Sequence, residues 1–227
     1  MPSVEPSGTT LQIESQYNQD SVIVSIDATT GVFDGNDSPV LIASSNGVMY
    51  LGKEMSLKNK TIKIPKQLFP SGIVRFSLLK QDIPLNERIV FINHYDNLKI
   101  NVEPDLESDK DSVRFKIQVK DAVGKPVTAT LSLSITDNSV VGADTSGNFD
   151  IGTSLLLNAE LKGEVENPGY YFSENAQQAS LSLDHLMLTQ GWVGYKWEDV
   201  FKLPILKVQA ERQDNVLIVK QIYFDNS

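Results

Sequence analysis

The amino-acid sequence predicts a mainly β protein, with two tandem immunoglobulin/fibronectin-like β-sandwich domains and one α-helix late in the second. Apolar residues alternate with polar residues over most of the chain, which is the pattern of strands that bury one face. Turn sequences separate these short runs at regular intervals, as in all-β sandwiches. Only one stretch, near residues 175–190, has the 3.6-residue apolar spacing of a convincing helix.

The first domain is expected at residues 1–96. Between Leu11 and Ile92 the sequence contains seven short runs in which apolar residues alternate with polar ones. Turn sequences lie between the runs, among them Asn46-Gly47 and Pro70-Ser71-Gly72. Seven short strands within roughly 100 residues are the content of one β-sandwich.

The second domain is expected at residues 97–198, after a short boundary segment at Asn93–Asn97. Its clearest strand pattern is Val113–Val119, where every second residue is apolar. A hairpin-type turn follows at Asp121–Pro126. The alternation then resumes over Thr128–Ile135, which predicts a further strand.

The helix inserted in this second domain is predicted at about residues 175–190. Asn175 is placed to cap its N-terminus, with Gln178 three residues later as the partner in a capping box. Gly191 stands where a C′ glycine would end the helix. The earlier run Ile151–Leu161 fits either a helix or a strand.

Residues 199–227 predict a terminal hairpin. Its strands are Leu203–Ala210 and Asn215–Phe224, and Glu211–Asp214 joins them. This hairpin either completes the second domain or starts a third one.

The composition excludes several classes of function. The chain has 20 Lys and Arg residues against 29 Asp and Glu residues, a net charge of −9, which argues against a nucleic-acid-binding face and a polybasic membrane anchor. It has no cysteine, which excludes disulfides, thiolate zinc sites, a cysteine nucleophile and an internal thioester. P-loop, dinucleotide-binding and nucleophile-elbow motifs are absent. We therefore predict no enzyme, no catalytic residue, no metal and no cofactor.

Two histidines and one acidic loop are the other candidates for a chemical site. His94 with Asp96 fits a metal or base site, but a polar linker that satisfies its own turn backbone is favoured. His185 is predicted to be a partly buried structural residue of the helix. The acidic segment Pro104–Asp111 has oxygen ligands suited to calcium, yet Lys110 stands where an EF-hand loop needs glycine. A solvated loop is therefore the favoured interpretation of that segment.

Aromatic residues cluster late in the chain and form the one speculative binding surface that the sequence offers. Flat rings provide large contact areas for sugars or peptides, but they also fill the space between a helix and a sheet, and the second interpretation is favoured. The residues assigned to this surface are Tyr170, Tyr171, Trp192, Tyr195 and Trp197.

Three parts of the chain together resemble a known family. The segments that carry the likeness are Pro84–Asn93, Val113–Asp137, and Leu161–Phe172 followed by Leu183–Trp192. Their order and spacing resemble large envelope proteins of Gram-negative bacteria that carry macroglobulin-type (MG2-like) domains. Such proteins often also carry a carboxypeptidase-regulatory-like or a TonB-receptor plug-like domain. The resemblance covers roughly residues 70–198 and implies fibronectin-like sandwich domains.

The expected function is that of a non-catalytic structural and interaction module of a bacterial cell-envelope protein, as part of a TonB-receptor-like or macroglobulin-like assembly. The resemblance implies a fragment of a longer secreted chain, located in the periplasm or at the outer membrane and cell surface. Its expected partners are neighbouring domains of that chain and a protein or glycan ligand, without nucleic acid or direct membrane insertion. The alternative is a glycan- or peptide-binding module that uses the aromatics near residues 170–197.

Overall fold

The computed structural model shows a mainly β protein with several antiparallel sheets, which confirms the predicted class. It describes residues 6–16, 18–33, 37–56, 60–81, 83–105, 114–137, 139–140, 142, 150–172, 176–191, 210–213 and 216–219. These belong to two compact units, Met1–Val193 and Gly194–Ser227. The predicted division into domains 1–96, 97–198 and 199–227 stays a prediction.

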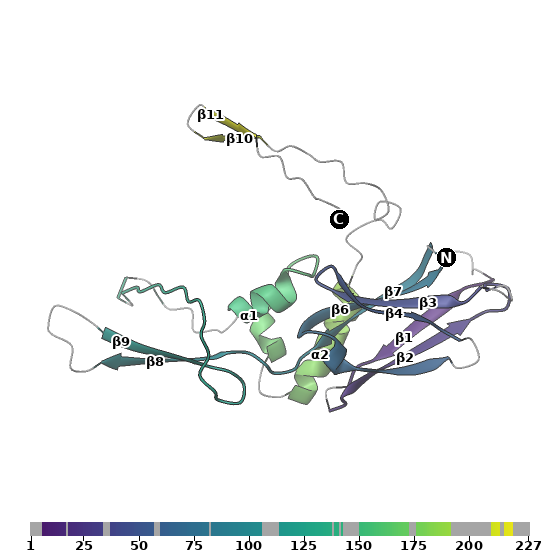
Figure 1. The fold of residues 1–227 in the computed structure, drawn as a ribbon, viewed down its shortest axis with the longest axis horizontal. Coiled ribbons are helices and arrows are strands. Elements are labelled where there is room, and N and C mark those ends of the chain that lie inside the picture. Colours follow the sequence, from purple (N-terminus) through teal and green to yellow (C-terminus); the bar gives the residue numbers. More distant parts are fainter. Residues whose placement is uncertain are drawn as a thin grey trace. The chain divides into compact units, whose positions relative to one another are not determined.

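The first unit contains a three-stranded and a four-stranded antiparallel sheet (Figure 1). The three-stranded sheet has the order β1-β2-β5, with β1 at Thr9–Glu14, β2 at Ser21–Ala28 and β5 at Thr61–Pro65. The four-stranded sheet has the order β4-β3-β6-β7, with β3 at Pro39–Ser45, β4 at Val48–Glu54, β6 at Gly72–Lys80 and β7 at Ile83–Ile92. All seven alternating runs predicted between Leu11 and Ile92 therefore form strands.

Both sheets contribute side chains to one hydrophobic core, called here the first core. Val22 and Val24 of β2 are fully buried in it, as are Phe76 and Leu78 of β6. These residues alternate along their strands with neighbours that point to the opposite face, as the two-residue period of a strand requires. The rings of Phe69 and Phe76 meet edge to face with centroids 5.7 Å apart.

A second core covers the opposite face of the four-stranded sheet. Ile73 of β6 and Ile89 of β7 are buried there, one residue out of phase with the strand residues of the first core. The helical segments that cover this face are a π-helical turn at Ser154–Asn158, a 3-10 helix at Pro168–Phe172, and α2 at Ala176–Gln190. The short α1 at Ile151–Thr153 leads into the π-helical turn. Because β6 is buried on both faces, its sequence is nearly a continuous apolar run.

The helix predicted at about residues 175–190 is confirmed, since α2 spans Ala176–Gln190. Its buried residues Leu183, Leu186 and Met187 pack against β7 and the rest of the second core. The proposed cap Asn175 lies outside the described residues. The ambiguous run Ile151–Leu161 is helical at its start, where Asp150 accepts a hydrogen bond from the Thr153 N–H (2.6 Å) in a capping box.

The region that follows β7 contains a two-stranded hairpin of β8 at Lys99–Asp105 and β9 at Arg114–Lys120. The turn after β9 is well formed, because the Asp121 carboxylate accepts hydrogen bonds from the Val123 and Lys125 N–H groups at 3.1 and 2.8 Å. Gly124 adopts a left-handed conformation there, with φ 88°.

The prediction of a strand at Thr128–Ile135 is wrong, because the structure has no strand over these residues. Antiparallel pairing begins with one hydrogen bond from the Val127 N–H to the Val119 carbonyl (3.1 Å) and then stops. Leu131, Leu133 and Ile135 remain exposed. Alternation of apolar and polar residues is not enough to form a strand, because the apolar face must also pack against another layer. No described residue covers the apolar face of this segment.

The second compact unit contains β10 at Ala210–Gln213, paired antiparallel with β11 at Val216–Val219. The predicted terminal hairpin is therefore present, but its connection is displaced. Glu211–Gln213 belong to a strand and not to the turn. The remaining parts of the predicted strands, residues 203–209 and 220–224, lie outside the described residues.

Gly191 follows the last residue of α2, as the sequence predicts, but it is not the expected C′ glycine. Its backbone is not left-handed, as a C′ glycine of the usual kind would be. A Cβ at this position would lie 2.7 Å and 2.9 Å from the Cγ1 and Cδ1 atoms of Ile89, and against the Met187 carbonyl oxygen. The glycine therefore permits close packing of the helix end on β7.

We expect Gly191→Ala to lower the free energy of unfolding by about 1–3 kcal/mol, because the added methyl overfills this contact. Denaturant unfolding followed by circular dichroism measures the change. Gly8→Ala is the matched control, since a Cβ at Gly8 meets no atom within 4 Å. Equal effects of the two substitutions would contradict the packing explanation.

Candidate functional site

Two adjoining hollows lie between the end of β1 and α2. The larger has a volume of about 540 Å³, and we call it the β1–α2 groove. The residues that line the groove are Ile13, Glu14, Ser15, Gln16, Asn18, Gln177, Ser180, Leu181 and Asp184. A smaller cavity of about 50 Å³ shares Ser15, Ser180 and Asp184 with it. Lys66, Asn93, Tyr95 and Tyr171 are among its other lining residues.

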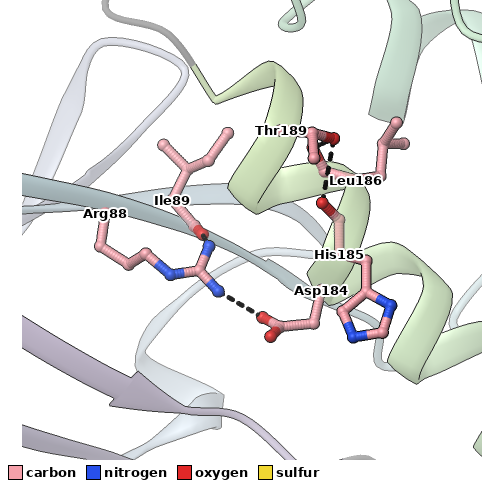
Figure 2. Close-up of polar contacts among 6 residues, drawn as sticks. All are labelled: Arg88, Ile89, Asp184, His185, Leu186 and Thr189. Carbon is pink, nitrogen blue, oxygen red and sulfur yellow. Dashed lines mark hydrogen bonds and ion pairs between the residues drawn. The ribbon is translucent and has the colours of Figure 1, made fainter.

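An ion pair fixes α2 at the side of the groove. The Arg88 Nη2 atom of β7 donates a hydrogen bond to the Asp184 Oδ1 atom at 2.7 Å, and its other terminal nitrogen donates to the Ile89 carbonyl oxygen. The Arg88 side chain is only 12% exposed, so solvent screens this pair less than a surface pair. Figure 2 shows the Asp184 carboxylate directed toward the guanidinium group.

His185 does not take part in this contact. Figure 2 shows its ring directed away from Arg88, and the residue is exposed. The prediction of a partly buried histidine is therefore wrong. The inward face of α2 is formed by Leu183, Leu186 and Met187, and position 185 faces away from them.

Side-chain oxygens accept two backbone N–H groups of residues 93–96, in line with the favoured interpretation of this segment as a polar turn. The Tyr95 N–H donates to the Asn93 Oδ1 atom at 2.8 Å, and the His94 N–H donates to the Ser71 hydroxyl at 3.0 Å. Ser71 in turn donates to the Asp96 carboxylate at 2.6 Å. A ring nitrogen of His94 lies 2.9 Å from the Phe69 carbonyl oxygen. Within the described ranges, no cluster of three or more histidine or acidic side chains is placed to hold a metal ion.

Tyr95 combines exposure with an unusual backbone conformation at the edge of the smaller cavity. Its φ is 54°, in the left-handed region that bulky residues rarely occupy, and 56% of its surface is exposed. Such a conformation in a non-glycine residue costs about 1–3 kcal/mol and occurs preferentially at functional sites. The Asn93 side chain holds the Tyr95 backbone in place, and the fold thereby presents an aromatic ring beside the cavity.

Two polar side chains in the lining are partly shielded from water. The Lys66 Nζ atom donates a hydrogen bond to the Gln16 carbonyl oxygen at 2.6 Å. Burial lowers the pKa of the Lys66 amine from its ordinary 10.5, and the Asp20 carboxylate partly opposes this shift. The Ser15 Oγ atom is enclosed by the protein and has no hydrogen-bond partner among the described residues.

Of the five aromatics assigned to the predicted binding surface, only Tyr170 and Tyr171 lie in the described residues. Their rings meet edge to face with centroids 5.5 Å apart. Tyr171 lines the smaller cavity and packs against the second core, whereas Tyr170 is 41% exposed and lines neither hollow. Trp192, Tyr195 and Trp197 lie outside the described residues, so the surface as a whole stays a prediction.

The pKa of the Tyr171 hydroxyl is raised from its ordinary 10.0, first by burial and then by Tyr170 and Glu166. A raised folded-state pKa means that the Tyr171 contribution to stability is complete below pH 10 and declines as the pH rises through the folded pKa. We expect the ultraviolet phenolate signal lost in Tyr171→Phe to titrate above that of an exposed tyrosine. Titration of this signal below pH 10 would contradict the assignment.

Sequence reasoning missed the β1–α2 groove. Ser15 and Gln16 follow a strand, and Gln177 and Ser180 belong to a helix more than 150 positions later, so no local motif joins them. The one local signal is Asn93 in the sequence Asn93-His94-Tyr95. An asparagine side chain often accepts a hydrogen bond from the backbone N–H two residues later, and the resulting turn here places Tyr95 beside the smaller cavity.

Among the described residues, no helix combines the length and hydrophobicity needed to cross a bilayer. Comparisons with protein-family models, with curated proteins and with solved structures find no match to this chain.

Proposed function

We propose that this chain is a non-catalytic structural and interaction module of a bacterial cell-envelope protein, located in the periplasm or at the outer membrane and cell surface. A fibronectin-like sandwich of the macroglobulin type is its central part. The two antiparallel sheets around the first core support this assignment, since seven strands in two sheets are the shared architecture of such domains. The helical segments over the second core stiffen the sandwich from outside.

The β8–β9 hairpin is the observation that carries the interaction role. Ile100 lies opposite Val119 and Val102 lies opposite Ile117 in the register, so their side chains share one face of the hairpin. Ile100 is 58% exposed and Phe115, on the same face, is 42% exposed. An isolated two-stranded hairpin is marginally stable in water, and open strand edges accept further strands. We assign this face to a neighbouring domain of the parent protein.

Site-specific photo-crosslinking within the intact parent protein tests this role. A benzophenone amino acid replaces Ile100 or Phe115 on the apolar face, and Asn101 or Lys116 on the opposite face serves as the matched control. The proposal predicts crosslinks to one discrete partner domain from the apolar positions and none from the controls. The same yield from both faces, or none from either, would contradict it.

The β1–α2 groove favours a second function, recognition of a glycan or a peptide. It has the volume of a small-ligand site, and hydrogen-bonding side chains line it from two separate parts of the chain.

A further inference from the structure

We propose that the β1–α2 groove binds a short, uncharged oligosaccharide, with Tyr95 as the aromatic contact at its end. The inference rests on the proposed interaction function and names the ligand class of the groove. A volume of about 540 Å³ falls within the range of roughly 300–1,000 Å³ that is typical of small-molecule sites. The smaller cavity, about 50 Å³, holds no more than a few ordered waters or one substituent of a sugar ring.

The lining matches the hydrogen-bonding chemistry of a sugar. Every sugar hydroxyl both donates and accepts, and the amides of Gln16, Asn18 and Gln177 also offer both functions. The hydroxyls of Ser15 and Ser180 can exchange roles in the same way. Because the Ser15 Oγ atom has no partner among the described residues, a ligand hydroxyl that reached it would satisfy a polar atom that is otherwise unsatisfied.

Apolar surface is available beside these polar groups. Leu181 of α2 lines the groove and is exposed, although it lies on the same helix as the buried second-core residues. The C–H face of a sugar ring packs against such surface and against aromatic rings. Tyr95 provides an exposed ring at the smaller cavity, which adjoins the groove through Ser15, Ser180 and Asp184.

The left-handed backbone of Tyr95 supports a binding role for its ring independently of the groove's lining. A glycine or asparagine would adopt φ 54° at lower cost, so the fold retains an exposed aromatic residue at a position that disfavours it. The ring does not stabilise the core, because more than half of its surface is exposed. Because folding does not require this exposed ring, we assign it the role of contacting a ligand.

The charges of the lining select against anionic sugars. Glu14 and Asp184 both line the groove, and Arg88 is already paired with Asp184. Lys66 lines the smaller cavity and not the groove, and its amine donates a hydrogen bond to the Gln16 carbonyl oxygen. An acidic sugar would therefore meet the carboxylates of Glu14 and Asp184 in the groove, where none of the described lining residues is a cation.

A peptide that added a strand to β1 is the rival ligand, and the edge of β1 disfavours it. The Asn86 side chain of β7 donates a hydrogen bond to the Thr9 carbonyl oxygen at 3.1 Å and also contacts the Thr9 hydroxyl. One end of the β1 edge is thus already occupied, whereas strand addition requires a continuous row of free backbone groups.

The experiment screens the intact chain on an array of neutral, N-acetylated and acidic oligosaccharides, with a random peptide array beside it, and titrates the best neutral hit by calorimetry. Tyr95→Gly is the decisive variant, because it removes the ring and relieves the backbone. We expect its affinity to fall by about tenfold or more while its melting temperature stays equal or rises. Gln177→Ala is expected to weaken binding severalfold.

Two matched controls give the result its specificity. Tyr50→Ala removes a similarly exposed ring outside both hollows, and Gln178→Ala removes an amide next to Gln177 that does not line the groove. Both should bind within about twofold of the unchanged chain. Equal losses in Tyr95→Gly and Tyr50→Ala would overturn the assignment, as would peptide binding without oligosaccharide binding or blank arrays with folded protein.

The array and crosslinking experiments distinguish a failure of the oligosaccharide site from a failure of the proposed interaction module. Blank arrays together with crosslinks from Ile100 and Phe115 would remove the oligosaccharide site and leave the interaction module intact. Oligosaccharide binding without those crosslinks would support the groove and remove the hairpin as the contact surface.

Discussion

Replacing Phe76 with alanine is expected to lower the free energy of unfolding by about 3–5 kcal/mol. Phe76 lies in the middle of β6, is fully buried and contacts Phe69 edge to face. Removal of the ring would leave a cavity between the two sheets, and strands paired on both sides of β6 resist collapse into it. Chemical denaturation followed by circular dichroism measures the loss.

Phe115→Ala is the matched control, because it removes the same ring from a position that is 42% exposed on β9. We expect its effect on the free energy of unfolding to stay below about 1 kcal/mol. A loss as large as that of Phe76→Ala would mean that the β8–β9 hairpin is covered, which contradicts the description of its apolar face.

Replacing Met187 with alanine is expected to cost about 2–5 kcal/mol, although it lies on a helix nearly one hundred residues after the sheet that it covers. Met187 is 2% exposed and shares the second core with Ile73 and Ile89. The substitution would open a cavity between α2 and the four-stranded sheet. Leu188→Ala, at an exposed neighbouring position of α2, should change the stability by no more than about 1 kcal/mol.

Local patterns in the sequence predicted the strands of the first 92 residues well. Alternation recurs in each of them, and most turns carry glycine, proline or asparagine, as at Asn46-Gly47. The helix at Ala176–Gln190 was also predictable, because its apolar spacing differs from that of the rest of the chain. These features depend on residues that are close in sequence.

The packing of α2 was not predictable in the same way. The sequence shows an apolar helix face but not which surface covers it, and a second sandwich was the simplest expectation. The better signal was in β6, where Ile73-Val74 and Leu78-Leu79 interrupt the alternation and indicate burial on both faces. At Thr128–Ile135 the local pattern predicts a strand that does not form. The apolar and polar residues alternate well, but no described layer packs against the apolar face.

The candidate site was harder to predict because its parts come from the end of β1, the segment after β7, and α2. Each part is unremarkable when read alone. Tyr95 belonged to a segment interpreted as a polar linker, and its hydrogen bonds fit that interpretation. The feature that distinguishes it, a left-handed backbone beneath an exposed ring, is visible only in three dimensions.

We expect the helical segments over the second core and the two sheets to stabilise one another as a single unit. Hydrogen exchange of the backbone amides in Met187→Ala measures this coupling, with Leu188→Ala as the reference. Protection should fall by the same free energy in α2 and in the first-core strands β2 and β6. Faster exchange confined to α2, with unchanged protection in β2 and β6, would contradict it and would make the helical layer a separate unit.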